Sequence, residues 1–262
     1  MGCRGGHKSH LAFSEAISRL MANTSQCMER VLIVTLRDDE GMTRKTLQGI
    51  LEARHSVALQ GKKASDKLRE MERRGYLEIT YFPPGYITPE EFFHRLLLSI
   101  NRLKSGTPEA HVTVVMNSLD QLSSRFPLCE RQQIFVPGII QMLSSEQASS
   151  FFVAATEPEH KGSYGLDTMA ELILSFSLEN VTVDNYLRYV ETAYPEIKAA
   201  EREALQINLK RKNLVNSVMV KVERYAGGQA AGARGVLELL EDTHPLHSIT
   251  AERDLVCLPD PF

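Results

Sequence analysis

The stretch GCRGGHKS, residues 2–9, has the layout of a phosphate-binding loop, G-x-x-x-x-G-K-[ST], except that His7 stands at the second glycine. In such a loop backbone N–H groups point at phosphate oxygens, the lysine reaches the β- and γ-phosphates, and the hydroxyl holds Mg²⁺. Lys8 and Ser9 would take those roles. An apolar helical pattern follows from Leu11 to Leu20, so a bound anion would also lie at a helix N-terminus.

His7 and the position of this stretch leave a second interpretation open, a Gly-rich N-terminal tail. A side chain at His7 would crowd the phosphates unless it points away from them. A phosphate-binding loop also joins a buried strand to a helix, and no residues precede Met1 to form that strand. We therefore expect either a fragment of a longer protein or a sheet that lacks one strand.

Composition favours one large α/β domain. Of the 262 residues 43% are hydrophobic, enough for a substantial core. No apolar run approaches the roughly 18 residues of a membrane span, and no apolar signal segment opens the chain, so we expect a cytoplasmic protein. Thirty basic and 33 acidic side chains give a net charge of -3, which does not favour nucleic acid as a partner. The four cysteines form no C-x-x-C pair, so they indicate neither a zinc site nor a disulfide framework.

Strand-like and helix-like segments alternate along the chain, which predicts a mostly parallel sheet wrapped by helices. The sequence Thr88-Pro89-Glu90-Glu91 is a helix start, with an N-cap, a first-turn proline and a capping-box glutamate. We expect one domain over residues 1–243, with a helical excursion at about 184–212, and a peripheral tail at 244–262. The predicted strands are residues 31–36, 76–82, 112–116, 151–155 and 172–178, then a hairpin of 218–224 and 236–240; the other predicted helices are about 43–74 and 134–143.

Several stretches together resemble the RecA-like P-loop ATPases, most closely the KaiC-like branch. GCRGGHKS resembles the Walker A loop, VTVVMNSLDQL (112–122) the Walker B strand, and VLIVTLRDD (31–39) the strand that in this family ends in catalytic glutamates. The segment FPPGYITPEEF (82–92) and the closing hairpin also look like that branch. The resemblance implies an α/β, RecA-like P-loop fold with a C-terminal β-hairpin. It further implies ATP and Mg²⁺ as cofactors and a homo-oligomer assembled through the nucleotide site.

Site residues follow from the same resemblance. The magnesium ligands fall on Ser9 and Asn117, and the paired glutamates on Arg37 and Asp38, so Asp38 or Asp39 is the catalytic candidate, with a solvated turn as the alternative. Asn117 keeps the shape of the Walker B aspartate but loses its charge, so we expect slow or no hydrolysis. The resemblance places the nucleotide against Gly2, Arg4, Gly5, Gly6, His7, Lys8, Ser9, His10 and Asn117, with Lys221 and Arg224 of the hairpin reaching a neighbouring subunit's nucleotide.

Four functions remain open at this point. The first is a nucleotide-binding regulatory module in which ATP favours assembly or partner docking, with slow or no hydrolysis. The second is an active ATPase with Asp38 or Asp39 as the base. A DNA-binding RecA-like protein is the third, supported by the basic segment from Lys62 to Arg74 and the small-residue loop near Gly228. The fourth is a structural pseudo-ATPase whose loop is empty. Lys8 and Ser9 together favour the first, and the protein partner is unknown.

Overall fold

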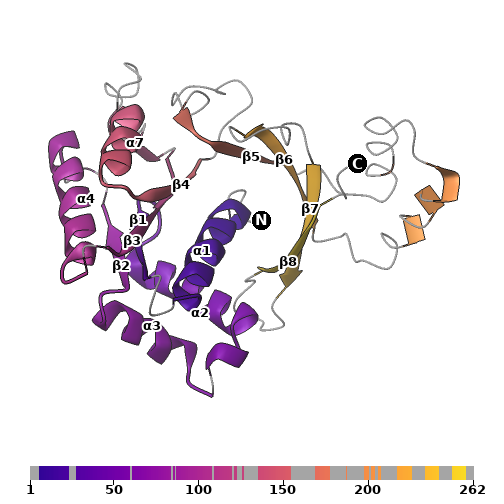
Figure 1. Cartoon of the computed structure of the whole chain (residues 1–262), viewed down its shortest axis with the longest axis horizontal. Coiled ribbons are helices and arrows are strands. Elements are labelled where there is room, and N and C mark those ends of the chain that lie inside the picture. Colours follow the sequence, from indigo (N-terminus) through magenta and orange to yellow (C-terminus); the bar gives the residue numbers. More distant parts are fainter. Residues whose placement is uncertain are drawn as a thin grey trace. The chain divides into compact units, whose positions relative to one another are not determined.

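The computed structural model of the chain describes two compact units, Met1–Met169 and Ala170–Phe262, each treated by itself below (Figure 1). In the part of the chain that the structure describes, no helix is both long and apolar enough to cross a membrane. The described residues are 6–23, 28–59, 61–83, 85, 87–107, 109–119, 121–122, 126, 135–154, 169–177, 187, 198–200, 202–203, 206–207, 217–225, 234–241 and 250–257.

The first unit is built on a four-stranded parallel sheet in the order β2-β1-β3-β4. Helices cover both of its faces, as Figure 1 shows. This confirms the predicted α/β class with a parallel sheet flanked by helices. The elements are α1 (Gly6–Met21), β1 (Glu29–Thr35), α2 (Glu40–Arg54), the short 3₁₀ helix η1 (Val57–Leu59), α3 (Ala64–Arg73), β2 (Leu77–Tyr81), α4 (Pro89–Lys104), β3 (His111–Asn117), α7 (Phe135–Ser145) and β4 (Ser149–Val153).

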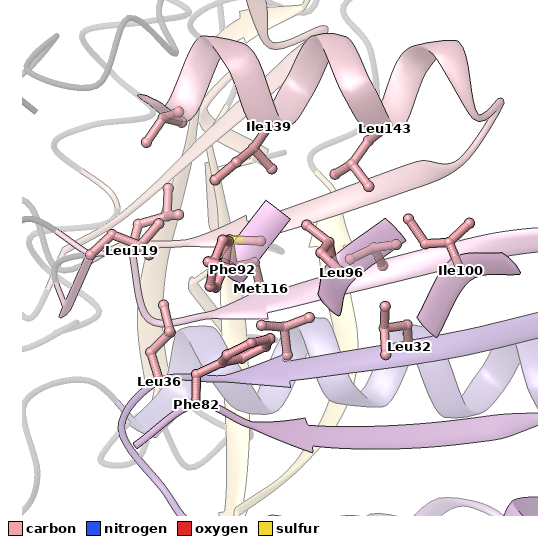
Figure 2. Packing of buried hydrophobic residues seen from close by; sticks show 14 of the residues in the cluster. Leu32, Leu36, Phe82, Phe92, Leu96, Ile100, Met116, Leu119, Ile139 and Leu143 are labelled. Atoms are coloured by element: carbon pink, nitrogen blue, oxygen red, sulfur yellow. The ribbon is translucent and has the colours of Figure 1, made fainter. Parts of the chain in front are cut away.

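Alternate residues of β1 pack into two separate cores. Val31 and Ile33 face the core formed with α1, α2 and α3, whereas Leu32 and Val34 face the core formed with α4 and α7. Figure 2 shows this second core, in which Phe92 of α4 lies among Leu36, Phe82 and Met116. Since successive strand side chains point to opposite faces, a continuous apolar run is the pattern of a strand buried on both sides.

Their apolar runs predict that the strands at Val31, Val112 and Phe151 are buried on both faces, which is correct for β1 and β3 but wrong for β4. The first four residues of β4 are half-buried, and only Val153 is buried. In the described part of the sheet β4 pairs with β3 alone, so it is an end strand there, and an end strand has fewer neighbours to cover it. The sequence Phe151-Phe152 is as apolar as the central strands and does not reveal this position.

Helix α4 begins as predicted, and the helical pattern expected over residues 43–74 is divided between α2, η1 and α3. Thr88 is the N-cap of α4 and its hydroxyl accepts a hydrogen bond from Glu91 N at 3.2 Å, with Pro89 in the first turn. Between α2 and α3 the chain passes through η1 and Gly61, whose φ of 80° is a left-handed conformation that glycine adopts without strain. The 3₁₀ turn and the left-handed Gly61 therefore interrupt a stretch whose apolar spacing is helical throughout.

The second unit contains a four-stranded antiparallel sheet in the order β5-β6-β7-β8. The segments expected to form a closing hairpin are β6 and β7, which are antiparallel neighbours inside this larger sheet. The tail expected to be peripheral contributes β8, paired with β7. Most of the helical excursion expected at 184–212 lies outside the described residues. The strands are β5 (Leu172–Ser177), β6 (Ser217–Tyr225), β7 (Arg234–Glu241) and β8 (Thr250–Cys257).

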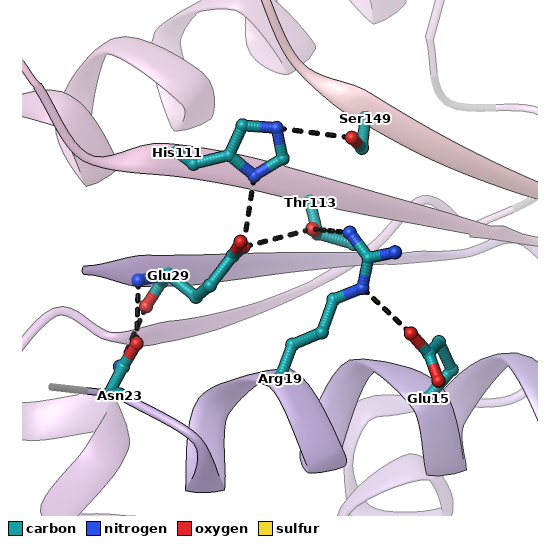
Figure 3. A network of polar contacts seen from close by, with 7 residues as sticks. All are labelled: Glu15, Arg19, Asn23, Glu29, His111, Thr113 and Ser149. Atoms are coloured by element: carbon teal, nitrogen blue, oxygen red, sulfur yellow. Dashed lines mark hydrogen bonds and ion pairs between the residues drawn. The ribbon is translucent and has the colours of Figure 1, made fainter. Parts of the chain in front are cut away.

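A polar network joins the last turns of α1 to the amino ends of β1, β3 and β4 (Figure 3). His111 Nδ1 lies 3.0 Å from Glu29 Oε2, and its Nε2 lies 3.1 Å from Ser149 Oγ. A carboxylate can only accept, so Nδ1–H donates to Glu29. Both ring nitrogens of His111 are thus used inside the network, which ties three strand starts together.

The same network holds α1 in place on the sheet. Arg19 donates to Glu15 at 2.9 Å and to the Thr113 hydroxyl at 3.3 Å, and its guanidinium lies 5.1 Å from the ring centre of Phe151. Asn23, just beyond the helix, donates to the backbone oxygen of Glu29 and accepts from its N–H. A 16-residue helix is about 24 Å long, so fixing this end also fixes where the other end lies.

We interpret the carboxylate, histidine and serine in series as a structural lock. A similar series occurs in serine hydrolases, but this one lies at the amino ends of parallel strands, opposite to the edge where α/β sheets bind ligands.

His111→Ala removes two partly buried hydrogen bonds and is expected to lower the free energy of unfolding by about 1–2 kcal/mol, measured by urea denaturation. His94→Ala, on the exposed side of α4, is the control and should change it by less than about 0.5 kcal/mol. Equal effects of the two variants would contradict the lock.

Candidate functional site

The N-terminus of α1 lies at the carboxyl edge of the parallel sheet. Lys8 Nζ donates to the backbone oxygen of Ala154, the residue after β4, at 2.8 Å. The carboxyl edge is where open α/β sheets bind ligands, and the first N–H groups of a helix have no partner inside the helix. The fold therefore brings a lysine and a set of backbone donors to the edge at which an anion would bind.

Ser9 and Asn117, which are 108 positions apart in the sequence, are joined by a hydrogen bond. Ser9 Oγ donates to Asn117 Oδ1 at 2.6 Å. Asn117 is the last residue of β3 and is 1% exposed. Its register partners are Thr35 at the end of β1 and Val153 at the end of β4. The bond thus connects the first turn of α1 to the middle of the sheet edge, and it joins the two residues that the resemblance gives as magnesium ligands.

The structure describes only some of the other residues predicted to form the loop. Gly2, Arg4 and Gly5 lie outside the described residues. Gly6 and His7 form the first residues of α1, so the helix begins earlier than its apolar pattern at Leu11 indicates. His10 is 5% exposed, which leaves little of its ring available to a nucleotide.

Asp38 and Asp39 follow β1 and have different surroundings. Asp39 is the N-cap of α2, and its Oδ1 accepts a hydrogen bond from Met42 N at 2.8 Å. Asp38 closes a turn through its backbone, because Thr35 Oγ1 donates to its carbonyl at 2.6 Å and accepts from its N–H at 3.2 Å. The Asp38 carboxylate lies 3.9 Å from Arg37 Nε, and both side chains are about half exposed. Capping therefore occupies Asp39, and Asp38 is the better candidate for a water-positioning base.

The side-chain oxygens of Ser9 and Asn117 are poor ligands for Mg²⁺. Both groups are neutral, and Asn117 Oδ1 already accepts the Ser9 proton, whereas Mg²⁺ in proteins is bound through carboxylates and phosphates. Two unit charges about 4 Å apart interact by about 4 kcal/mol near a protein surface, and a divalent cation doubles that attraction. One missing carboxylate is therefore a large loss. Among the described residues no group of three or more His, Cys, Asp or Glu side chains could hold a metal ion.

Lys221 and Arg224 lie on β6 of the second unit, and their separation along the sequence differs from the separation of their pairing partners. They are three residues apart, but their register partners on β5 are Ser175 and Ile173, which are two apart. A register shift at Ile173/Leu174 absorbs the extra residue, as a β-bulge does. The two residues are thus three apart along β6 but pair with β5 positions that are two apart.

Three features of the site were not predicted from the sequence. They are the Ala154 carbonyl that receives Lys8, the cap made by Asp39, and the bulge between Lys221 and Arg224. Asp39 could have been recognised, since Asp followed by a helical pattern is a typical N-cap. The other two depend on strands that are distant in the sequence, and no local pattern indicates them.

The cap at Asp39 predicts separate effects for two neighbouring aspartates. Asp39→Ala removes the hydrogen bond to Met42 N and should lower the free energy of unfolding by about 1 kcal/mol, while Asp39→Asn, an equally good cap, should largely retain it. Asp38→Ala is the control, because the hydrogen bonds of Asp38 come from its backbone. Chemical denaturation of the three variants measures this. If Asp38→Ala were the more damaging change, the assignment of the cap would be wrong.

Comparisons with known proteins do not assign a family to this chain. A scan against protein-family models and a search of curated proteins each found no match. What the structure shows is an α/β unit whose four-stranded parallel sheet is flanked by helices. This arrangement is compatible with a Rossmann-like or a RecA-like fold.

Proposed function

We propose that this chain is an ATP-binding regulatory module of the KaiC-like type, in which nucleotide favours assembly or partner docking and hydrolysis is slow or absent. The observation that carries the proposal is the hydrogen bond from Ser9 to Asn117. It brings the end of the loop-like stretch to the end of the Walker B-like strand, at the carboxyl edge of the sheet.

The chemistry of the edge supports anion binding more than catalysis. Lys8, the first N–H groups of α1 and the amide of Asn117 are all hydrogen-bond donors, which match phosphate oxygens. Catalysis would need charge neutralisation and a positioned water, and the neutral Asn117 and the capping role of Asp39 weaken both. An active ATPase that uses Asp38 as its base is the alternative, favoured by the half-exposed carboxylate after β1.

The contact between Lys8 and Ala154 bears on the empty-loop alternative. The bond to the backbone carbonyl uses one of the three N–H donors of Lys8, and it would be lost if the side chain moved to reach a phosphate. Hydrogen bonds to charged groups contribute a net of about 1.5–3 kcal/mol each. A triphosphate offers several such bonds to the lysine and the helix N-terminus together, so the exchange favours nucleotide. We therefore place the nucleotide-binding module before the structural pseudo-ATPase.

Binding and turnover should separate in a direct measurement. Calorimetric titration with ATP should show binding to the wild type, and Lys8→Ala should weaken it by about 100-fold or more, since at least one charged hydrogen bond to phosphate is lost. Lys45→Ala, at an exposed position of α2, is the matched control and should bind as the wild type does. Phosphate release should stay well below about 1 per second, the lower edge of ordinary enzyme rates.

Two results would change the assignment. Absence of ATP binding to the wild type would favour the empty structural scaffold. Turnover of about 1 per second or faster that is lost in Asp38→Asn would favour the active ATPase instead. The two outcomes are distinct, because the first is read from binding heat and the second from released phosphate.

Assembly supplies a further check of the proposed module. The register partners of Lys221 and Arg224 on β5 are two residues apart, a spacing that supports a basic pair reaching the nucleotide of a neighbouring subunit. Lys221→Glu combined with Arg224→Glu should therefore reduce ATP-dependent oligomer formation in light scattering and leave the secondary structure unchanged in circular dichroism. A wild type that stays monomeric with and without ATP would remove the role in trans.

A further inference from the structure

We propose that the site at Ser9 and Asn117 binds the triphosphate group without a divalent cation, an inference that depends on the nucleotide binding proposed above. The ligand class is then the metal-free nucleoside triphosphate, in which the protein's own donors replace the cation. Two observations support this inference. The first is that the oxygen and the nitrogen of the Asn117 amide have different hydrogen-bonding roles, and the second is the surroundings of Asp38 and Asp39, the acidic residues that follow β1.

The oxygen of the Asn117 side chain is already used. Ser9 donates its only hydroxyl proton to Asn117 Oδ1 at 2.6 Å, which leaves the Asn117 Nδ2 group and its two N–H donors for other partners. Nδ2 is not among the fully buried side-chain atoms that lack a hydrogen-bond partner, so its two N–H groups can donate to a phosphate oxygen at the sheet edge.

An N–H donor at this position acts in the opposite sense to a carboxylate. A carboxylate attracts a cation and repels a bare triphosphate, so an aspartate there makes binding depend on Mg²⁺. The partial positive charge of an amide N–H favours the anion and disfavours the cation. Lys8 and the N-terminus of α1 act in the same direction as the amide. The summed effect is a site in which Mg²⁺ adds little to the affinity for ATP.

The two acidic residues after β1 do not restore a cation site. Asp39 accepts from Met42 N as the cap of α2, and Asp38 lies beside Arg37. Thr35, the register partner of Asn117, uses its hydroxyl on the backbone of Asp38. The Asp39 carboxylate and the Thr35 hydroxyl are therefore used in local turns, and the Asp38 carboxylate lies beside a guanidinium.

The test compares ATP binding in excess Mg²⁺ with ATP binding in EDTA, by calorimetry on the full chain. We expect the two dissociation constants of the wild type to agree within about threefold. Asn117→Asp should bind at least tenfold more weakly in EDTA than in Mg²⁺, because the new carboxylate repels the bare triphosphate. Asn101→Asp, the same change at an exposed position of α4, is the matched control and should behave as the wild type does. Inorganic triphosphate, titrated in EDTA, checks that the base is not required.

The outcomes distinguish this inference from the function on which it depends. Wild-type binding that is more than tenfold weaker in EDTA overturns the metal-free site and leaves the nucleotide-binding module standing. No binding under either condition overturns both. The wild-type comparison decides the matter even if a buried aspartate at position 117 prevents folding. In that case Ser9→Ala, which removes the bond to Oδ1 and adds no charge, should also show equal affinities with and without Mg²⁺.

Discussion

The burial of β1 and β3 on both faces is the constraint on which the rest of the first unit depends. Val31, Leu32, Ile33 and Val34 are fully buried, and each such side chain contributes about 1.5–3 kcal/mol relative to an exposed one. Together they amount to a stabilisation comparable to the whole net stability of a typical domain, about 5–15 kcal/mol. That burial exists only if helices cover both sides of the sheet, so α4 and α7 on one side and α1, α2 and α3 on the other are required by the strands.

Helix α1 connects the two ends of this sheet. Near its C-terminal end Arg19 and Asn23 reach the amino ends of the strands, and near its N-terminal end Lys8 and Ser9 reach the carboxyl edge. A helix is stiff over this length, so the lock around His111 helps to set the position of the candidate site at the opposite edge. Packing and function are linked here by a single rigid element.

The chemistry at that edge separates two properties that usually occur together in phosphate-binding loops. Affinity for phosphate depends on donors and positive charge, which Lys8, the helix N-terminus and Asn117 supply. Hydrolysis depends on a held cation and a positioned water, for which the edge offers neutral groups and an aspartate engaged as a cap. Binding without efficient turnover is what the function proposed above requires, in which the nucleotide acts as a ligand that favours assembly or docking.

The sequence by itself determined the α/β class, the parallel core strands and the start of α4, because apolar periodicity and capping are local properties. It also selected Lys8, Ser9 and Asn117 as candidates from residue type and spacing. Only the tertiary structure decided that Ser9 donates to Asn117, that Lys8 contacts Ala154, that β4 is an end strand in the described sheet, and that Asp39 caps α2. Three of these four depend on which strands are neighbours, and strand order is set by packing between segments up to 146 residues apart, beyond the reach of any local pattern.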